Sequence, residues 1–112
     1  MEEIQQIENT IDEIISSDEL NKILSENTNV LVNFYAQWCT PCRFLDMELR
    51  KLIHLPILKI VKINKDLANE LFENFGIQHI PTLKLYINNE DKITLLGYST
   101  NHIQTILQLI TS

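Results

Sequence analysis

Basic residues and long apolar runs are scarce in this sequence, and each scarcity excludes a class of protein. The 9 Lys and Arg residues stand against 15 Asp and Glu, and the resulting net charge of -6 repels phosphate backbones and anionic lipid headgroups. The longest apolar runs, such as Val30 to Ala36, are far shorter than the ~20 residues of a membrane-spanning helix. We therefore expect neither a nucleic acid nor a membrane as a partner.

Cysteine is equally rare, because the chain holds only Cys39 and Cys42. Two cysteines this close together cannot form the long-range crosslinks that stabilise small secreted domains. The first residues, Met1 to Gln6, also lack the positive start and apolar stretch of a secretory signal. The sequence therefore predicts a cytoplasmic protein whose cysteine pair serves redox or metal chemistry.

A structural zinc site is the metal alternative for this pair, and it needs two further ligands. The three histidines, at positions 54, 79 and 102, are scattered along the chain rather than spaced for a shared site. His54 and His102 are expected on the surface near helix ends. We therefore expect no bound metal.

Apolar periodicity predicts one α/β domain over residues 11–112, preceded by a polar tail over residues 1–10. At this length the chain is able to bury a single core. After a short apolar segment at 11–15, strands are predicted at 30–35, 57–63, 82–87 and 93–96. Helices are predicted from Ser16 to about Ser25, over 43–53, after Asp66 to Gly76, and from about Thr100. The order is βαβαβαββα, which predicts a mixed central sheet with helices on both faces.

Several element ends carry local signals. Ser16 and Glu19 match a capping box, and Pro56 prevents continuation of the second helix. Asp66 is expected to cap the third helix, and Gly76 is expected to end it in left-handed geometry. The inward residues of that helix are predicted to be Leu67, Leu71, Phe72 and Phe75. The last two strands are predicted to join through the turn 88–91.

The cysteine motif lies where the strand 30–35 meets the following helix. Unpaired backbone N–H groups and the helix dipole at such a terminus favour a thiolate, so Cys39 is the expected nucleophile. Thiols in C-x-x-C motifs of this kind have a pKa lowered from about 8.5 to about 7 or below. Cys42, one turn later, is placed to attack Cys39 and release a reduced product. Pro41 fits the first helical turn, where a missing N–H costs little.

Residues 30–43, Val-Leu-Val-Asn-Phe-Tyr-Ala-Gln-Trp-Cys-Thr-Pro-Cys-Arg, resemble the active-site strand and motif of the thioredoxin family. Ile80-Pro81-Thr82 resembles the cis-proline segment of that family, and Leu96-Gly97 resembles the glycine-containing end of its last strand. The resemblance covers residues 11 to 110. It implies a thioredoxin fold, with the cis-proline segment facing the cysteines.

The resemblance also implies an activity, the reduction of protein disulfides by dithiol–disulfide exchange. Substrate would pair its backbone beside Ile80, in a groove formed by Trp38, Thr40, Pro41, Ile80, Pro81 and Gly97. Electrons would come from a thioredoxin reductase, no bound cofactor would be needed, and the protein would be a monomer. Two alternatives stay open, namely a more oxidising disulfide oxidase or isomerase, and a binding or assembly module that uses the fold without thiol turnover.

Three further residues could modulate the site, namely Asn33, Lys62 and His79. Asn33 stands where the family usually has a buried aspartate that relays a proton to and from the second cysteine. One interpretation is that Asn33 changes the pH dependence of the Cys42 step, and the other is that its amide only satisfies a buried hydrogen-bonding position. Lys62 matches a family lysine but would lack its charge partner and turn to solvent. His79 could touch substrate or shift the thiol titration.

Overall fold

The computed structural model describes residues 11–112, and the tail predicted at 1–10 lies outside them. The predicted order of elements is confirmed, with four helices and five strands in the described part. The strands are β1 (Asp12–Glu13), β2 (Asn29–Tyr35), β3 (Lys59–Asn64), β4 (Thr82–Ile87) and β5 (Glu90–Leu96). The helices are α1 (Ser17–Glu26), α2 (Thr40–Arg50), α3 (Asn69–Asn74) and α4 (Asn101–Thr111).

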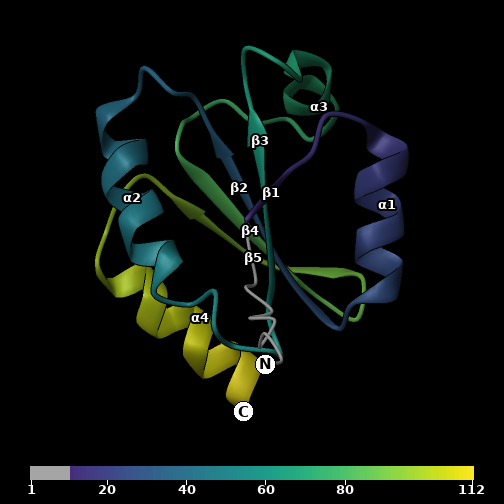
Figure 1. Cartoon of the computed structure of the whole chain (residues 1–112), viewed down its shortest axis with the longest axis vertical. Helices are drawn as coiled ribbons and strands as arrows, with labels where there is room; N and C mark the ends of the chain where they lie inside the picture. Colours follow the sequence, from purple (N-terminus) through teal and green to yellow (C-terminus); the bar gives the residue numbers. More distant parts are fainter. Residues whose placement is uncertain (1–10) are drawn as a thin grey trace, which may run out of the picture.

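The sheet is mixed and runs in the order β1-β3-β2-β4-β5. The pairs β1–β3 and β2–β3 are parallel, whereas β2–β4 and β4–β5 are antiparallel. Helices α1 and α3 cover one face, and α2 and α4 cover the other (Figure 1). The predicted mixed sheet with helices on both faces is therefore confirmed.

Strand β2 supplies both faces of the core because its side chains alternate. Val30, Val32 and Phe34 belong to the buried cluster beneath α1 and α3, and Leu31 belongs to the cluster beneath α2 and α4. By the same alternation, Asn33 and Tyr35 lie on the α2 face. A polar pair is thereby placed behind the cysteine motif rather than in the opposite core.

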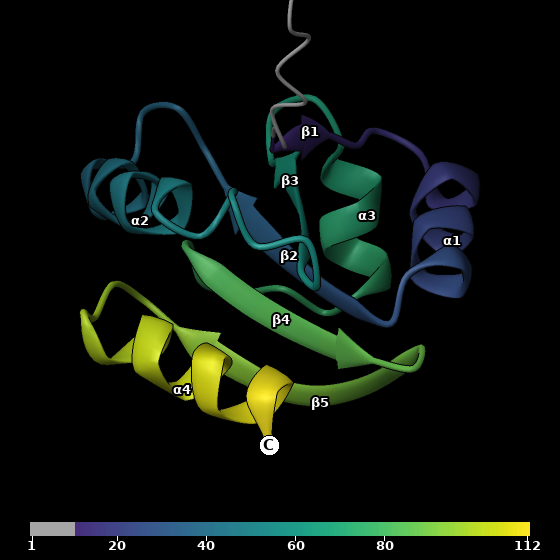
Figure 2. The ribbon, with the colours of Figure 1, turned by 60° about the horizontal axis from the view of Figure 1, so that its bottom comes forward.

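The C-terminal hairpin and α4 close one edge of the domain (Figure 2). In α4, Ile106 is fully buried, and Ile103, Leu107 and Ile110 pack against the same cluster. The predicted four-residue turn is wrong, because β5 already begins at Glu90. Only Asn88 and Asn89 form the turn, with φ of 54° and 64°, which is the left-handed geometry that tight hairpins require. Among residues 11–112, no helix combines the length and apolar character needed to cross a bilayer.

The third helix differs most from its prediction. It begins at Asn69, with Ala68 in the cap position and no side-chain cap bond, so Asp66 is not its cap. The Asn64 side chain instead accepts a 2.8 Å hydrogen bond from the Asp66 N–H and shapes a turn before the helix. Leu67 falls in this turn and is 65% exposed, contrary to the inward position predicted for it. Gly76 does adopt the predicted left-handed conformation, with φ of 65°.

Candidate redox site

Cys39 and Cys42 form a disulfide at the start of α2, with their Cα atoms 5.2 Å apart. Cys39 is the N-cap residue, so α2 begins three residues before its predicted start, and Pro41 lies in the first turn. The Cys39 Sγ accepts a 3.2 Å hydrogen bond from the Cys42 N–H. A helix N–H aimed at this sulfur stabilises negative charge there once the disulfide is reduced.

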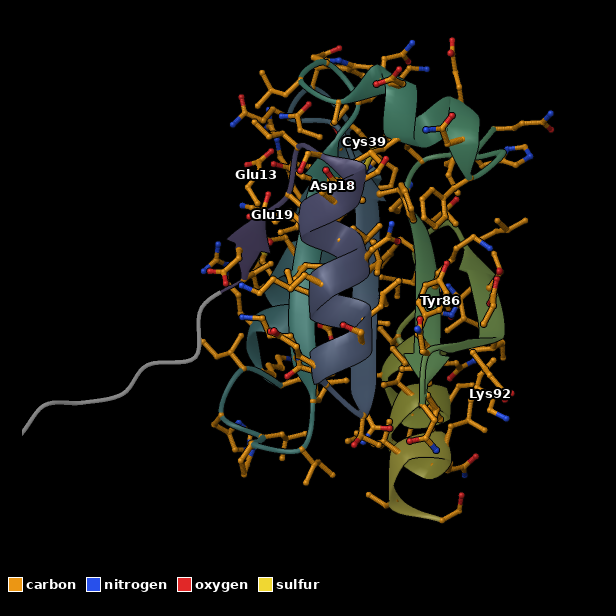
Figure 3. The ribbon with its side chains drawn as sticks, turned by 90° about the vertical axis from the view of Figure 1, so that its right-hand side faces the viewer. Glu13, Asp18, Glu19, Cys39, Tyr86 and Lys92 are labelled. Atoms are coloured by element: carbon orange, nitrogen blue, oxygen red, sulfur yellow. A yellow bond between two sulfur atoms is a disulfide. The ribbon has the colours of Figure 1, made fainter. Side chains whose placement is uncertain are left out.

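The two sulfur-bearing residues differ little in exposure but differ in surroundings. Cys39 is 6% exposed and Cys42 is 3% exposed. Figure 3 places Cys39 at the end of the molecule where α1 begins with Asp18 and Glu19. Ala36 completes a small buried cluster with the two cysteines. Cys42 also lines a pocket behind the disulfide, and Cys39 does not.

The predicted groove residues come together from three segments of the chain. Trp38, Thr40 and Pro41 are exposed beside the disulfide, and the Trp38 side chain is 62% exposed. Ile80 packs against the cluster that holds both cysteines. Pro81 follows a cis peptide bond, and its carbonyl accepts a 2.8 Å hydrogen bond from the Gly97 N–H. The segments that carry these residues therefore lie close together, whereas a groove between them and the contribution of each residue to substrate binding stay predictions.

His79 precedes Ile80, the residue that packs against the cysteine cluster. Its side chain is exposed, and it lines a small separate pocket of about 120 Å³ with Gly76, Thr82 and Leu96. Its carbonyl accepts a 2.6 Å hydrogen bond from the Thr82 hydroxyl. The structure thus places the His79 backbone at the start of β4, and a role in substrate contact or thiol titration stays a prediction.

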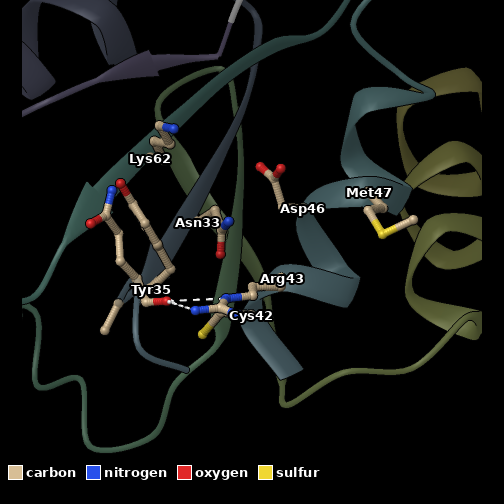
Figure 4. Close-up of a pocket in the computed structure, with 9 residues that line it drawn as sticks. Asn33, Tyr35, Cys42, Arg43, Asp46, Met47 and Lys62 are labelled. Atoms are coloured by element: carbon tan, nitrogen blue, oxygen red, sulfur yellow. Dashed lines mark hydrogen bonds between the residues drawn. The ribbon is translucent and has the colours of Figure 1, made fainter. Parts of the chain in front are cut away.

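Behind the disulfide lies a pocket of about 500 Å³ between α2 and the strands β2 and β3 (Figure 4). Asn33 and Lys62 are register partners across β2 and β3, so the sheet presents them side by side to this pocket. The lining residues are Asn33, Tyr35, Ala36, Gln37, Cys42, Arg43, Asp46, Met47 and Lys62. The family resemblance had linked Asn33 with Lys62, but it gave no indication of a cavity.

Asn33 is 2% exposed, and its Oδ1 has no hydrogen-bond partner among the described residues. Whether Asn33 alters the Cys42 step or only satisfies a buried hydrogen-bonding position stays a prediction. Lys62 is half-buried, with its Nζ 5.4 Å from the centre of the Tyr35 ring, so it does not turn fully to solvent.

Tyr35 is the group in this pocket whose titration is most altered. Its hydroxyl donates hydrogen bonds to both Glu13 carboxylate oxygens, at 3.0 and 3.1 Å. Burial, and then the Glu13 hydrogen bond and charge, raise the pKa of Tyr35 from 10.0 to about 12. Tyr35 is therefore a neutral phenol throughout the physiological range.

Asp46 is a pocket residue that sequence reasoning missed. It forms an exposed ion pair with Arg50, whose Nε lies 2.8 Å from Asp46 Oδ2. The spacing of four residues from Cys42 was the available signal, because residues at i and i+4 share one face of a helix. Asp46 thus shares the pocket with Cys42 and Asn33.

No cluster of three or more His, Cys, Asp or Glu residues suited to a metal ion occurs within residues 11–112. The chemistry available to the site resides in the sulfurs themselves. A cysteine pair that closes a disulfide at a helix N-terminus, beside a cis-proline, defines a thiol–disulfide oxidoreductase.

The chain belongs to the thioredoxin family, since the family model for thioredoxin matches residues 12–110. The chloroplastic thioredoxin M5 of rice is 34% identical over 97 residues, which cover 82% of this chain and 56% of the rice protein. Thioredoxin of the red alga Griffithsia pacifica is 31% identical over 90 residues, which cover 79% of this chain and 83% of that one. The solved structure of a mutant thioredoxin from Halobacterium salinarum has a TM-score of 0.84 and 25% identity, with 96% of each chain covered.

Family and site together establish a protein-disulfide oxidoreductase, and neither the oxidase or isomerase alternative nor the binding-module alternative is favoured. Like other thioredoxins, the protein requires no cofactor, because the electrons are held by the Cys39–Cys42 pair.

Proposed function

We propose that this protein works in the reducing direction, with Cys39 as the nucleophile and Cys42 as the resolving thiol. The observation that carries this assignment is the hydrogen bond from the Cys42 N–H to Cys39 Sγ at the start of α2. This bond and the helix terminus favour a thiolate at Cys39, and the thiolate is the attacking form.

In the first step, the Cys39 thiolate attacks one sulfur of a substrate disulfide and expels the other sulfur as a thiolate. In the second step, Cys42 attacks Cys39, the mixed disulfide breaks, and the substrate leaves with both of its sulfurs reduced. Cys39 is 6% exposed and Cys42 is 3% exposed, so exposure does not set the order of the two steps. The order is supported by the helix N–H at Cys39 and by the position of Cys42 on the pocket behind the disulfide.

The exposed Trp38 and the Ile80–Gly97 neighbourhood support an extended substrate segment as the bound form. A segment that pairs through its backbone leaves little demand on side-chain identity, which suits varied protein substrates. Thr40 and Pro41 would form the opposite side of this groove.

Electrons for the next cycle would come from a thioredoxin reductase, which would make the protein a carrier in an electron-transport chain. Relatives named as thioredoxins support this partner. The monomeric state and the cytoplasmic location remain predictions, which gel filtration with light scattering and cell fractionation would test.

Reduction of insulin by dithiothreitol tests the proposed activity. The wild-type protein should accelerate precipitation of the released insulin chain, whereas Cys39→Ser should leave the rate at that of dithiothreitol alone. Equal rates for the two proteins would favour a binding or assembly module instead.

A further inference from the structure

The resolving step requires Cys42 to lose a proton from a side chain with little direct exposure on the protein surface. Cys42 is 3% exposed on the protein surface, and its remaining open side faces the pocket between α2, β2 and β3. The thiol proton must therefore leave through that pocket. The groups that line the pocket decide where the proton can go.

Four titratable or charged side chains besides Cys42 line this pocket: Tyr35, Arg43, Asp46 and Lys62. Arginine keeps its proton in proteins, and a lysine ammonium is a donor without a lone pair. Tyr35 keeps its own proton, because burial and Glu13 raise its pKa to about 12. Asp46 is the carboxylate among the residues that line the pocket.

We propose that Asp46 accepts the Cys42 proton through water in this pocket and passes it to solvent during the resolving step. The proposal rests on the proposed function, since it concerns the second half of the same exchange. Asp46 acts through water, so it is a positioning residue for proton transfer rather than a group that touches the reacting sulfurs.

The placement of Asp46 suits this role. It lies one helical turn after Cys42 on α2 and projects toward the strands that carry Asn33 and Lys62 (Figure 4). Its side chain is 32% exposed, so it connects the pocket with bulk water. The 2.8 Å ion pair with Arg50 fixes the orientation of the carboxylate.

Asn33 supplies a second, independent observation. Its Oδ1 is buried at the pocket and has no hydrogen-bond partner in the described part of the chain. A buried amide oxygen without a partner costs about 1–3 kcal/mol, and a bound water offsets that cost. The pocket of about 500 Å³ exceeds the ~30 Å³ that one water molecule occupies in the liquid. Asn33 can therefore hold water between Cys42 and Asp46.

The charged groups that face Asp46 come from three elements. Arg43 and Arg50 lie on α2, Lys62 lies on β3, and the neutral Tyr35 lies on β2. These cations offset the negative charge of the ionised Asp46 carboxylate, which is the form that can accept a proton. Loss of Asp46 would therefore leave the pocket cationic.

The resolving step moves one proton and replaces one sulfur–sulfur bond by another. The Cys42 thiol gives its proton to Asp46, and the electron pair left on Cys42 Sγ forms the bond to Cys39 Sγ. The bond between Cys39 and the substrate sulfur breaks, and that sulfur leaves as a thiolate that takes a proton from the solvent. The protein dithiol is oxidised by two electrons, and the substrate disulfide is reduced by two.

Stopped-flow mixing of the reduced protein with an aromatic disulfide tests the proposal, because each step releases one coloured thiolate. Asp46→Asn should leave the first phase unchanged and slow the second phase about tenfold near about pH 6, which corresponds to ~1.4 kcal/mol. The difference should vanish as the pH approaches about 9, where the thiol ionises without assistance. Simple loss of a negative charge would ease ionisation of Cys42 and speed the second phase.

Glu48→Gln is the matched control, because Glu48 lies on the same helix in an ion pair with Lys51 at 3.3 Å but does not line the pocket. It should behave as the wild type does. Asn33→Asp combined with Asp46→Asn should restore the second phase by returning a carboxylate to the pocket. A second phase in Asp46→Asn that matches the wild type at every pH would overturn the role of Asp46. Failure of the wild type to release a second thiolate would instead contradict the proposed function, and the role of Asp46 with it.

Discussion

The indole Nε1 of Trp38 donates a 3.0 Å hydrogen bond to the carboxylate of Asp66. This bond joins the residue before Cys39 to the turn between β3 and α3, 28 positions later in the sequence. The Trp38 side chain is 62% exposed, so packing alone constrains it weakly. The hydrogen bond therefore sets the orientation of the ring beside the disulfide.

Asp66→Ala should free the indole while hardly changing the fold. The cost in the free energy of unfolding should not exceed about 1.5 kcal/mol, because the bond is exposed to water. Faster decay of Trp38 fluorescence anisotropy would report the freed ring. Attack on a folded protein disulfide should slow severalfold, and attack on a small aromatic disulfide should not. Asp91→Ala, which breaks the exposed ion pair with Lys84, is the control that should leave the anisotropy unchanged.

Asn33→Asp should make stability depend on pH. Burial at a position only 2% exposed disfavours the charged carboxylate and raises its pKa in the folded state, with Lys62 offsetting part of the effect. A raised folded pKa leaves stability intact below the unfolded pKa of about 3.9 and removes it as the pH rises through the folded pKa. At neutral pH, the free energy of unfolding of the variant should therefore fall by about 1.4 kcal/mol for each unit by which the carboxyl pKa is raised. In acid it should not fall for this reason.

Urea unfolding in acid and at neutral pH measures this difference. Asn33→Leu is the matched control, because it removes the unpartnered oxygen without adding a titrating group. Its difference from the wild type should be the same at both pH values. An Asn33→Asp variant with a pH-independent stability difference would show that the carboxylate is well solvated there.

Glu13→Gln should lower the pKa of Tyr35 from about 12 without returning it to 10.0. Burial is the largest cause of the shift, and the Glu13 hydrogen bond and charge come next, so removing the charge reverses only part of it. Because the folded pKa lies above the unfolded one, stability is present below about pH 10 and is lost as the pH rises through about 12. Glu13→Gln should lose less folding stability than the wild type as the pH rises from about 10 to about 12.

Tyrosinate absorbance against pH measures this value. The titration is best done in a Tyr86→Phe background, because burial and Asp91 also raise the pKa of Tyr86 to about 12. An unchanged midpoint after Glu13→Gln would mean that Glu13 has no part in the shift.

Gly97→Ala and Gly76→Ala should cost similar stability for the same backbone reason. Their φ angles are 72° and 65°, and a Cβ added at either glycine meets nothing within 4 Å. The cost is therefore that of placing a residue with a side chain in left-handed geometry, about 1–2 kcal/mol. The Gly97 backbone N–H is bonded to the Pro81 carbonyl, so a backbone shift that relieves strain at Gly97→Ala would displace the cis-proline segment, and only this variant should also weaken reduction of protein substrates. Equal loss of activity in both variants would contradict this distinction.

The fold was predictable from sequence because most elements carry their own periodic signal. The strand at 30–35 and the amphipathic pattern of α4 were each identified within about two residues. The apolar pattern marks α2 only from residue 43, because its first turn carries Thr40 and Pro41, whereas the cysteine motif placed Cys39 at the helix terminus, where it is the N-cap. Asp66 was wrongly predicted to cap α3, because aspartate suits a cap position. Its carboxylate instead accepts the hydrogen bond from Trp38 Nε1.

The site was predictable only where short motifs define it. Cys39, Cys42 and Pro81 belong to recognisable local patterns, and the structure brings the segments that carry them together. The pocket behind Cys42 was not predictable, because it depends on how α2 packs across β2 and β3. Asp46 was not predictable as a pocket residue either, because its spacing from Arg50 indicates only a surface ion pair, which it also forms.

The assignment of roles to the two cysteines is tested most directly by trapping on a protein disulfide, followed by intact mass and peptide mapping. Cys42→Ser should accumulate a stable mixed disulfide on Cys39, since Cys39 attacks and no resolving thiol remains. Cys39→Ser should accumulate little adduct, because the helix N–H that favours a thiolate points to position 39, and Cys42 faces the pocket. Equal adducts on Cys42 in Cys39→Ser, or no adduct on Cys39 in Cys42→Ser, would contradict the assignment.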